Sequence, residues 1–454
     1  MKKKSLIFSL FSLFFLCCVF SNSNNASSVE VLKLDNNIPV YIKNLKNSKV
    51  CSVNIVVKGG VRYLTPDQSG LERALFTMMT KGSKFYPYQN IQSFFYKKQG
   101  SFSSSTSRYG STLSITCLNK YFDETFDRFA DGFNNPAFGA KEYDLLIQDY
   151  NQEVQYTLND PDNMLFYYAN QMIYSEHPYA VSSSVTLDSI QNITIDELKK
   201  LHAKILDSRR ISIVACGAFD SKELVAKLNS AFGKIKPQNY EIKEEKIPPV
   251  KINGKPVVLV NPDAKNSGYL LRCFTSPDIH NEDYAAALLI ENIYSNILYN
   301  VVREKNGICY TPSTFVVSSD APFGAEYLYR TSNLKDFNKA LKEARDIMSQ
   351  GKTISGRDKN GEYIFDSLDN SLHGYKNTYI NRKYSSQATV GGQASRMCGG
   401  ILQFDDITAS EKITAAVKNV SVQDIERVFE KYWLSSEEQW FCVIAPEEES
   451  EIRF

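Results

Sequence analysis

Apolar residues along the chain fall into short runs that predict β-strands next to helical patterns. Residues 211–215 and 440–444 alternate or are apolar throughout, as expected for strands of a sheet. Residues 53–57 and 269–274 are further strand-like runs, and each leads after a turn into a helical pattern. This arrangement predicts an α+β fold.

The chain also repeats itself. A segment that starts at Asn192 and a segment that starts at Asn419 each carry a helical stretch followed by an apolar strand, and their offset is 419 − 192 = 227 residues. Residues 236–252 are charged, bear prolines and lack periodicity, which is typical of a linker. The sequence therefore predicts two homologous domains, 29–235 and 253–447, each a mixed β-sheet packed with helices.

Both repeated segments begin their helix with the spacing of a capping box. Thr194 precedes Glu197 by three residues, and Ser421 precedes Asp424 by three. We expect Asp424 to be the weaker substitute for glutamate at the second position.

The first 28 residues read as a targeting segment. Three lysines are followed by an apolar run over residues 6–20 and then by small polar residues, which is the pattern of a secretory signal peptide. Lipid attachment at Cys17 or Cys18 is the less favoured alternative, because their neighbours fit a lipidation motif poorly. We expect an exported protein, periplasmic or extracellular, with no transmembrane segment after the signal is removed.

The charge balance and the cysteine content argue against several classes of function. The 52 Lys and Arg nearly balance the 51 Asp and Glu and are scattered along the chain, which argues against a nucleic-acid partner. The seven cysteines beyond the signal are odd in number and form no Cys-x-x-Cys pair, so neither a disulfide framework nor a zinc finger is expected. We expect most of them to be buried as small apolar residues.

Residues 70–83, Gly-Leu-Glu-Arg-Ala-Leu-Phe-Thr-Met-Met-Thr-Lys-Gly-Ser, carry the most specific signal. They resemble the Gly-Leu-x-His-x-x-Glu-His-Met-x-x-x-Gly-Thr/Ser segment of M16 (pitrilysin- and insulinase-like) zinc peptidases. In that family, the two histidines bind zinc from one helical face and the glutamate activates water. Here Arg73, Phe76 and Thr77 stand at the three reactive positions.

The resemblance also implies a third metal ligand, a glutamate about 76 residues beyond the second histidine position. Glu153 stands there. One carboxylate beside a cationic arginine cannot hold a catalytic zinc ion, so we expect the metal to be absent. We further expect Arg73 to form a salt bridge with Glu153, since the carboxylate would otherwise face a partly buried site unpaired; an Arg73 side chain that extends to solvent is the alternative.

No other metal site is expected, because no two histidines lie within a helical turn of each other. His177 stands in a His-Pro-Tyr segment that resembles a structural turn of the family. The four histidines are His177, His202, His280 and His373.

Two further segments resemble the substrate-binding parts of M16 proteins. Ser103 stands where the family has an asparagine, on a strand that pairs with substrate backbone. Arg303 and Tyr310 match an Arg-Glu-x-x-Gly-Leu-x-Tyr segment whose Arg and Tyr reach toward the substrate. A solvated helix end capped at Gly307 is the structural alternative for the second segment.

This combination is similar to the zinc-free subunit of two-chain bacterial M16 peptidases. It implies an inactive partner that forms a heterodimer with an active zinc subunit and helps to bind a peptide. One alternative is a structural or peptide-binding module without a peptidase partner. Another is a peptidase with an unrecognised mechanism, although no nucleophile lies near a histidine in a recognisable motif.

Overall fold

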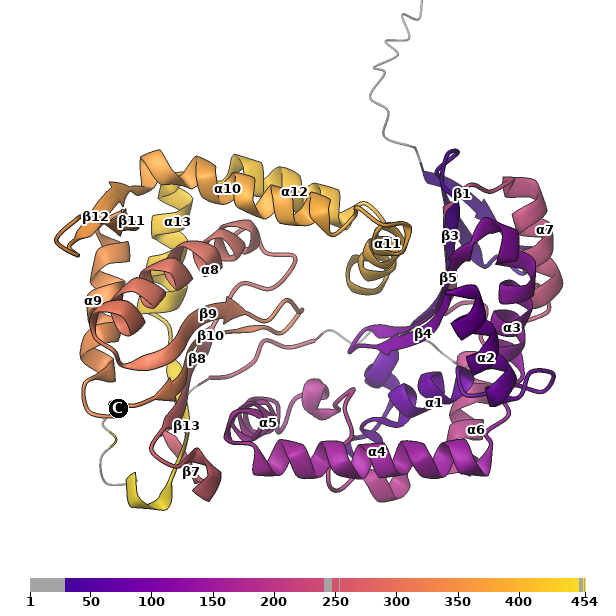
Figure 1. Cartoon of the computed structure of the whole chain (residues 1–454), viewed down its shortest axis with the longest axis horizontal. Helices are drawn as coiled ribbons and strands as arrows, with labels where there is room; N and C mark the ends of the chain where they lie inside the picture. Colours follow the sequence, from indigo (N-terminus) through magenta and orange to yellow (C-terminus); the bar gives the residue numbers. More distant parts are fainter. Residues whose placement is uncertain (1–28, 241–246, 253, 449–451, 453) are drawn as a thin grey trace, which may run out of the picture.

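The computed structural model describes residues 29–240, 247–252, 254–448, 452 and 454. Two β-sheets, each covered by helices, lie on opposite sides of the molecule (Figure 1). The first sheet and its helices come from the first half of the chain, and the second sheet comes from the second half.

The first sheet is mixed, since β2 pairs with β6 in parallel and the remaining pairs are antiparallel. Its strands, in pairing order, are β1 (Val29–Lys33), β2 (Pro39–Asn44), β6 (Ile211–Gly217), β3 (Val50–Lys58), β5 (Gly110–Leu118) and β4 (Ser101–Thr106). β4 forms one edge, so the outer backbone groups of this strand are open to a further strand.

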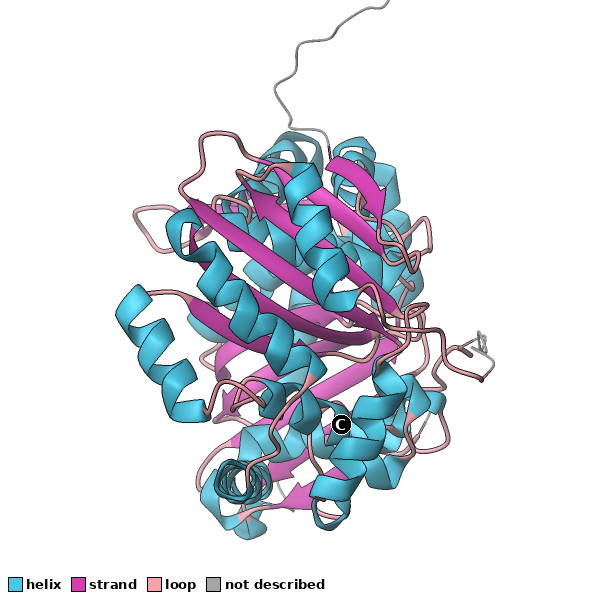
Figure 2. Ribbon diagram, turned by 90° about the vertical axis from the view of Figure 1, so that its right-hand side faces the viewer, coloured by secondary structure: helices cyan, strands magenta, loops and turns pink. Residues whose placement is uncertain are grey.

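Helices of the first half cover one face of this sheet, and seen from that side they lie over its strands (Figure 2). Apolar residues from both layers, among them Ile55, Leu75 and Phe129, form one fully buried core. The helices of this half are α1 (Leu71–Met79), α2 (Tyr88–Lys98), α3 (Phe122–Asn134), α4 (Ala140–Asn159), α5 (Pro161–Ile173), α6 (Ile195–Ile205) and α7 (Ser221–Phe232).

The second sheet repeats the strand order of the first without its β1. Its strands, in pairing order, are β7 (Val257–Val260), β13 (Glu438–Ile444), β8 (Gly268–Thr275), β10 (Phe323–Thr331) and β9 (Cys309–Val316). The parallel pair is again the one at the same position, β7 with β13. The predicted duplication is therefore confirmed at the level of topology, and the α+β class with it.

The second half has its own set of helices and one addition. Its helices are α8 (Tyr284–Leu298), α9 (Phe337–Ser349), α10 (Leu368–Ser385), α11 (Val390–Phe404), α12 (Ala409–Asn419) and α13 (Val422–Val428). Two of them continue as π-helical turns, α8 into Tyr299–Lys305 and α13 into Phe429–Leu434. The hairpin of β11 (Lys352–Arg357) and β12 (Tyr363–Ser367) is the addition, because it forms a separate two-stranded sheet and the described strands of the first half all belong to one sheet.

The two halves exchange one helix each. α5 of the first half packs on the second sheet, where Leu165 and Ala169 join Leu271 and Phe441 in a buried core. α11 of the second half packs on the first sheet, where Met397 and its neighbours meet Val56 and Val214.

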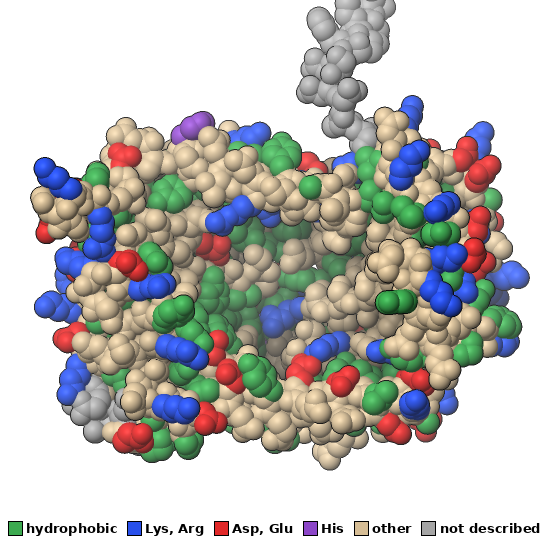
Figure 3. Space-filling model, viewed as in Figure 1, with side chains coloured by type: hydrophobic (Ala, Val, Ile, Leu, Met, Phe, Trp, Pro, Cys, Tyr) green, Lys and Arg blue, Asp and Glu red, His purple; other side chains and the backbone are tan. Residues whose placement is uncertain are grey.

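Ion pairs and hydrogen bonds reinforce this exchange: Lys58 binds Asp405, Arg62 binds Asp320, and the Tyr327 hydroxyl binds Asp162. The two halves therefore hold each other in place around the hollow, which the space-filling view shows as a depression between them (Figure 3).

A buried charge network braces the second sheet. Glu326 on β10 lies directly opposite Arg272 on β8, and their side chains approach to 3.3 Å. Arg345 from α9 also pairs with Glu326, and the Tyr294 hydroxyl donates to it at 2.9 Å. Although burial opposes it, the guanidinium groups of Arg345 and Arg272 lower the pKa of Glu326 to about 2.

The helix caps correct one expectation. Ser421 and Asp424 form the complete reciprocal capping box, whereas Thr194 only accepts from the Glu197 backbone N–H at 3.2 Å. The Glu197 carboxylate instead accepts from Lys200 at 2.6 Å. The expectation that Asp424 is the weaker cap was wrong, since a nearby lysine diverts the longer glutamate side chain.

The described cysteines, from Cys51 to Cys442, are all buried, as expected. Within the described part of the chain, no helix is long and apolar enough to cross a membrane. The predicted signal peptide, with Cys17 and Cys18, lies outside the described residues. Between α7 and β7, the described residues form neither helix nor strand, in keeping with a linker there.

Candidate functional site

Within residues 70–83, helix α1 begins directly after Gly70. Gly70 has φ 80°, and a Cβ at this position would approach the backbone N and Cα of Val185 within 2.9 Å, so only glycine fits the turn into α1. The helix then buries one face in the core and leaves Arg73 and Thr77 half-buried on the other. The positions four residues apart therefore do share a face, as the spacing predicts.

Arg73 and Glu153 form the salt bridge that we expected. Nη1 of Arg73 lies 2.7 Å from Oε1 of Glu153, and Nη2 lies 2.9 Å from Oε2, so the contact between α1 and α4 is bidentate. The guanidinium also lies over the ring of Tyr150, 5.1 Å from its centre. Hydrogen bonding to Glu153 raises the pKa of Arg73. Both side chains are about one-third exposed, at 37% and 33%.

The other two positions of the segment where the resemblance implies reactive residues, Phe76 and Thr77, also carry unsuitable side chains. Phe76 is 0% exposed and belongs to the apolar core, where it cannot polarise water. Thr77 offers a hydroxyl, which is a poor zinc ligand beside a guanidinium. Among the described residues, no group of three or more His, Cys, Asp or Glu side chains is arranged to hold a metal ion. The donor set at this position does not fit zinc; the absence of zinc from the protein itself stays a prediction.

Glu72, the carboxylate of α1, does not provide a metal ligand either. Glu72 points into the core, where its Oε1 accepts a 2.6 Å hydrogen bond from Ser111. Burial raises the pKa of Glu72, although Ser111 and Arg210 oppose the shift. This side chain is held away from the Arg73 face.

Ser103 lies on the edge strand β4, opposite Ser114 of β5. Its side chain is exposed, as are those of Ser101 and Ser105. A small cavity of about 250 Å³ adjoins this strand, lined by Ser105, Ser107 and neighbouring hydroxyl-bearing residues and closed by α11. An extended peptide could pair with the free edge of β4, which is a common mode of peptide binding.

Arg303 and Tyr310 come together on the opposite domain. Arg303 lies on the π-helical turn after α8, and Tyr310 lies near the start of the edge strand β9. The guanidinium carbon is 4.8 Å from the centre of the Tyr310 ring and 5.0 Å from that of Tyr299. Tyr310 is 61% exposed. The pair is thus a cation–π unit with an open phenol.

The Arg73–Glu153 pair of the first half and the Arg303–Tyr310 pair of the second half do not contact each other. β4 and β9 belong to the two different sheets and lie on opposite sides of the molecule's centre (Figure 1). No hydrogen bond or ion pair between described residues joins Arg303 or Tyr310 to Arg73 or Glu153.

His177 has the structural role that we expected. Its Nδ1 accepts from the Tyr179 backbone N–H at 3.0 Å, and its Nε2 lies 2.8 Å from the Pro248 carbonyl oxygen. The ring therefore fixes a turn against the segment that links the two halves.

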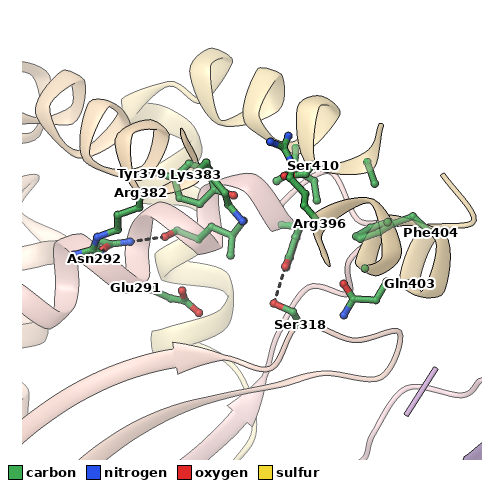
Figure 4. A pocket seen from close by; sticks show the side chains of 16 residues that line it. Glu291, Asn292, Ser318, Tyr379, Arg382, Lys383, Arg396, Gln403, Phe404 and Ser410 are labelled. Carbon is green, nitrogen blue, oxygen red and sulfur yellow. Dashed lines mark hydrogen bonds between the residues drawn. The ribbon is translucent and has the colours of Figure 1, made fainter. Parts of the chain in front are cut away.

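One polar pocket was missed by the sequence analysis. It lies between α8, α10, α11 and α12 and contains Glu291, Lys383 and Arg396 (Figure 4). These residues come from separate helices, and no local motif marks them. Only the three-dimensional packing could have revealed the pocket.

Comparison with known proteins places both halves in the same group. Residues 39–186 match the family model "Insulinase (Peptidase family M16)", and residues 192–352 match "Peptidase M16 inactive domain". A zinc protease of Rickettsia bellii, described as uncharacterized, is 22% identical over 293 residues, which cover 63% of this chain and 69% of the relative.

Two further relatives bear on function. A non-peptidase homologue of Helicobacter pylori is 21% identical over 179 residues, 39% of this chain and 41% of the relative. The crystal structure of the periplasmic protease PqqL of Escherichia coli has a similar fold, with a TM-score of 0.71 and 14% identity. The match covers 98% of this chain and 49% of that one.

Proposed function

Because this chain belongs to the insulinase family of peptidases, family M16, we propose that it is a peptide-binding subunit that does not cleave peptides by itself. In this proposal it forms a heterodimer with an active zinc peptidase of the same family. The Arg73–Glu153 salt bridge is the observation that carries the proposal, because it occupies the place where the family holds its zinc.

The chemistry of α1 supports the lack of catalysis. A guanidinium fork already uses both oxygens of Glu153, and Phe76 fills the position of the general base with an apolar ring. No group here can bind water and take a proton from it at neutral pH. Cleavage would require a second chain with an intact His-x-x-Glu-His segment.

The retained groups support peptide binding. The open edge of β4 offers backbone donors and acceptors to an extended peptide, next to Ser103. Arg303 and Tyr310 carry donors suited to carbonyl and carboxylate oxygens. Their role is to orient the peptide in the hollow, and such positioning can contribute substantially to the rate of a reaction carried out by another subunit.

The length relationship to PqqL supports a partner of the same fold. That single chain is about twice as long as this one and matches it over one half. A separate subunit could supply the equivalent of the other half. The proposed site of action is the periplasm or the extracellular space, in agreement with the signal peptide that the sequence predicts at residues 1–28.

A peptide-binding or structural module without a peptidase partner is the second candidate. The replacement of the family's asparagine by Ser103 and the existence of a relative named a non-peptidase homologue favour it. The retained Arg303–Tyr310 stack opposes a purely structural role, since a stack with an exposed phenol contributes little to stability.

Purification from the native source under mild conditions separates the two candidates. We expect the chain to co-purify with a second M16 chain, identified by mass spectrometry, in a 1:1 complex. A chain that elutes alone at native concentration, with no such partner after crosslinking, would favour the module.

A further inference from the structure

The polar pocket of the second half encloses about 440 Å³ between α8, α10, α11 and α12. Ser318, from the loop between β9 and β10, closes one side (Figure 4). Gly399 and Gln403 of α11 line both this pocket and the serine-lined cavity beside β4. The pocket is thus a neighbour of the edge strand proposed to hold peptide.

Two donors in the pocket lack acceptors. The hydroxyl of Tyr379 and Nε of Arg396 are both buried, and neither has a hydrogen-bond partner among the described residues. Tyr379 is only 8% exposed, and burial raises the pKa of its hydroxyl, so that it remains a donor. Unsatisfied buried donors are unfavourable and uncommon in folded proteins.

Lys383 adds an uncompensated charge. Its ammonium lies 5.2 Å from the centre of the Tyr379 ring, and no ion pair joins it to a described carboxylate. Burial, together with the charge of Arg396, lowers the pKa of Lys383.

The remaining charged groups do not neutralise this end of the pocket. Arg382 donates to the neutral Asn292 at 2.7 Å, and Arg396 pairs through Nη2 with Glu411, whose side chain is mostly exposed. Glu291 accepts from the Val316 backbone N–H, and burial raises its pKa to about 7. Cationic side chains therefore outnumber carboxylates, and two donors point to no protein acceptor.

We propose that this pocket binds a small carboxylate-type or phosphate-type anion, which in this protein is the C-terminal carboxylate of a peptide. Lys383, Arg396 and Tyr379 would donate to its oxygens. The carboxylate assignment rests on the proposed peptide-binding function, because the pocket adjoins the cavity beside β4, the strand along which the peptide would bind. Inorganic phosphate shares the same chemistry, so the test compares the two.

The test uses a fluorescent peptide of about six residues with the full chain, prepared once as the free acid and once as the C-terminal amide. We expect the free acid to bind at least about tenfold more tightly, the change that one charged hydrogen bond provides. Lys383→Gln and Arg396→Gln should remove this preference, and Tyr379→Phe should reduce it. Lys342→Gln, an exposed lysine of α9, is the matched control and should leave it unchanged.

The outcomes separate the two proposals. Equal binding of acid and amide overturns the carboxylate site and leaves the peptide-binding function standing. Phosphate binding that Lys383→Gln abolishes, without any peptide binding, overturns the peptide assignment. Melting temperatures of all variants, by circular dichroism, exclude misfolding as the cause.

An independent observation concerns two cysteines. Cys51 of β3 and Cys117 of β5 lie directly opposite each other in the antiparallel pair, and their sulfurs are 3.8 Å apart. Both are buried, at 2% and 3% exposure. Directly opposite residues of antiparallel strands have Cα atoms about 4.5–5.5 Å apart, within the range of about 4.4–6.8 Å that a disulfide spans.

We infer that Cys51 and Cys117 form a disulfide when the chain folds in an oxidising compartment. The two thiols lose two protons and two electrons, one S–S bond forms, and a disulfide oxidant such as oxidised glutathione is reduced to two thiols. The pairing would form during folding, before the sheet buries both sulfurs.

Refolding in oxidised glutathione tests this inference. We expect an intact mass lower by about 2 Da and one linked peptide pair that contains Cys51 and Cys117. Cys51→Ala should abolish the link, whereas Cys216→Ala, a buried cysteine of β6, should retain it. Unchanged free thiols in the wild-type chain, or a link between other cysteines, would overturn the inference.

Discussion

The guanidinium of Arg73 and the carboxylate of Glu153 meet edge to edge, with contacts of 2.7 and 2.9 Å between α1 and α4. The same two positions would carry zinc ligands in an active family member. In the proposed role, this contact between two side chains stands where an active member would have a metal ion.

The strength of this contact can be measured by a double-mutant cycle. Arg73→Met, Glu153→Gln and the double variant should show a coupling energy of about 1 kcal/mol in urea unfolding, because the pair is bidentate but one-third exposed. The Lys342–Asp346 pair on α9 is a matched exposed control and should couple by less than half of this. Additive effects for Arg73 and Glu153 would show that the contact contributes nothing.

Metal binding should be recoverable. Arg73→His combined with Thr77→His restores two ligands on one face of α1, and Glu153 supplies the third. We expect this double variant to retain about one zinc ion per chain after dialysis, as measured by inductively coupled plasma mass spectrometry. The wild type and Thr77→His alone should retain none. Failure of the double variant to bind zinc would show that α1 and α4 no longer hold the geometry of a metal site.

The Arg303–Tyr310 pair should affect peptide binding without affecting stability. Arg303→Lys keeps the charge but loses the planar fork that stacks on Tyr310, and we expect about a tenfold lower kcat/KM in the complex with the active subunit. Tyr310→Phe should act in the same direction. Lys305→Gln, two residues away and half exposed, is the local control and should leave kcat/KM within twofold.

The buried network around Glu326 gives a pH-dependent prediction. The folded-state pKa of Glu326 is about 2, below its ordinary value of 4.5, so its contribution to stability is present above about pH 4.5 and lost as the pH falls toward 2. Glu326→Gln leaves Arg272 and Arg345 partly unpaired and should lower the free energy of unfolding by about 3–5 kcal/mol at pH 7. Urea titrations at pH 7, 4.5 and 3 should show the difference from wild type shrink at the lowest pH; a constant difference would contradict this assignment.

Local sequence patterns predicted the elements well, because strands and helices depend on periodicity and caps. The strand at residues 211–215 followed from such a pattern, whereas the turn at His177 followed from the family resemblance. The exchange of α5 and α11 did not, because each helix is amphipathic toward a sheet on the other half of the chain, and periodicity does not say which sheet that is. Glu197 shows the same limit on a smaller scale, because its carboxylate pairs with Lys200 and does not complete the expected capping box.

The candidate site shows the same difference between local sequence features and long-range contacts. The resemblance to the family's segments singled out Arg73, Glu153, Arg303 and Tyr310, and the structure adds their contacts. The pocket of Lys383 and Arg396 and the sulfur contact of Cys51 with Cys117 join residues from separate elements. Such long-range neighbours have no signature in a single sequence.

The most direct test of the central claim is to measure zinc content and peptide cleavage for the purified chain alone and for the same chain recombined with its co-purifying partner. The account predicts no zinc above background and no cleavage by the lone chain. It predicts zinc-dependent cleavage by the complex, which Arg303→Lys weakens. One zinc per lone chain, or chelator-sensitive cleavage by it, would contradict the account.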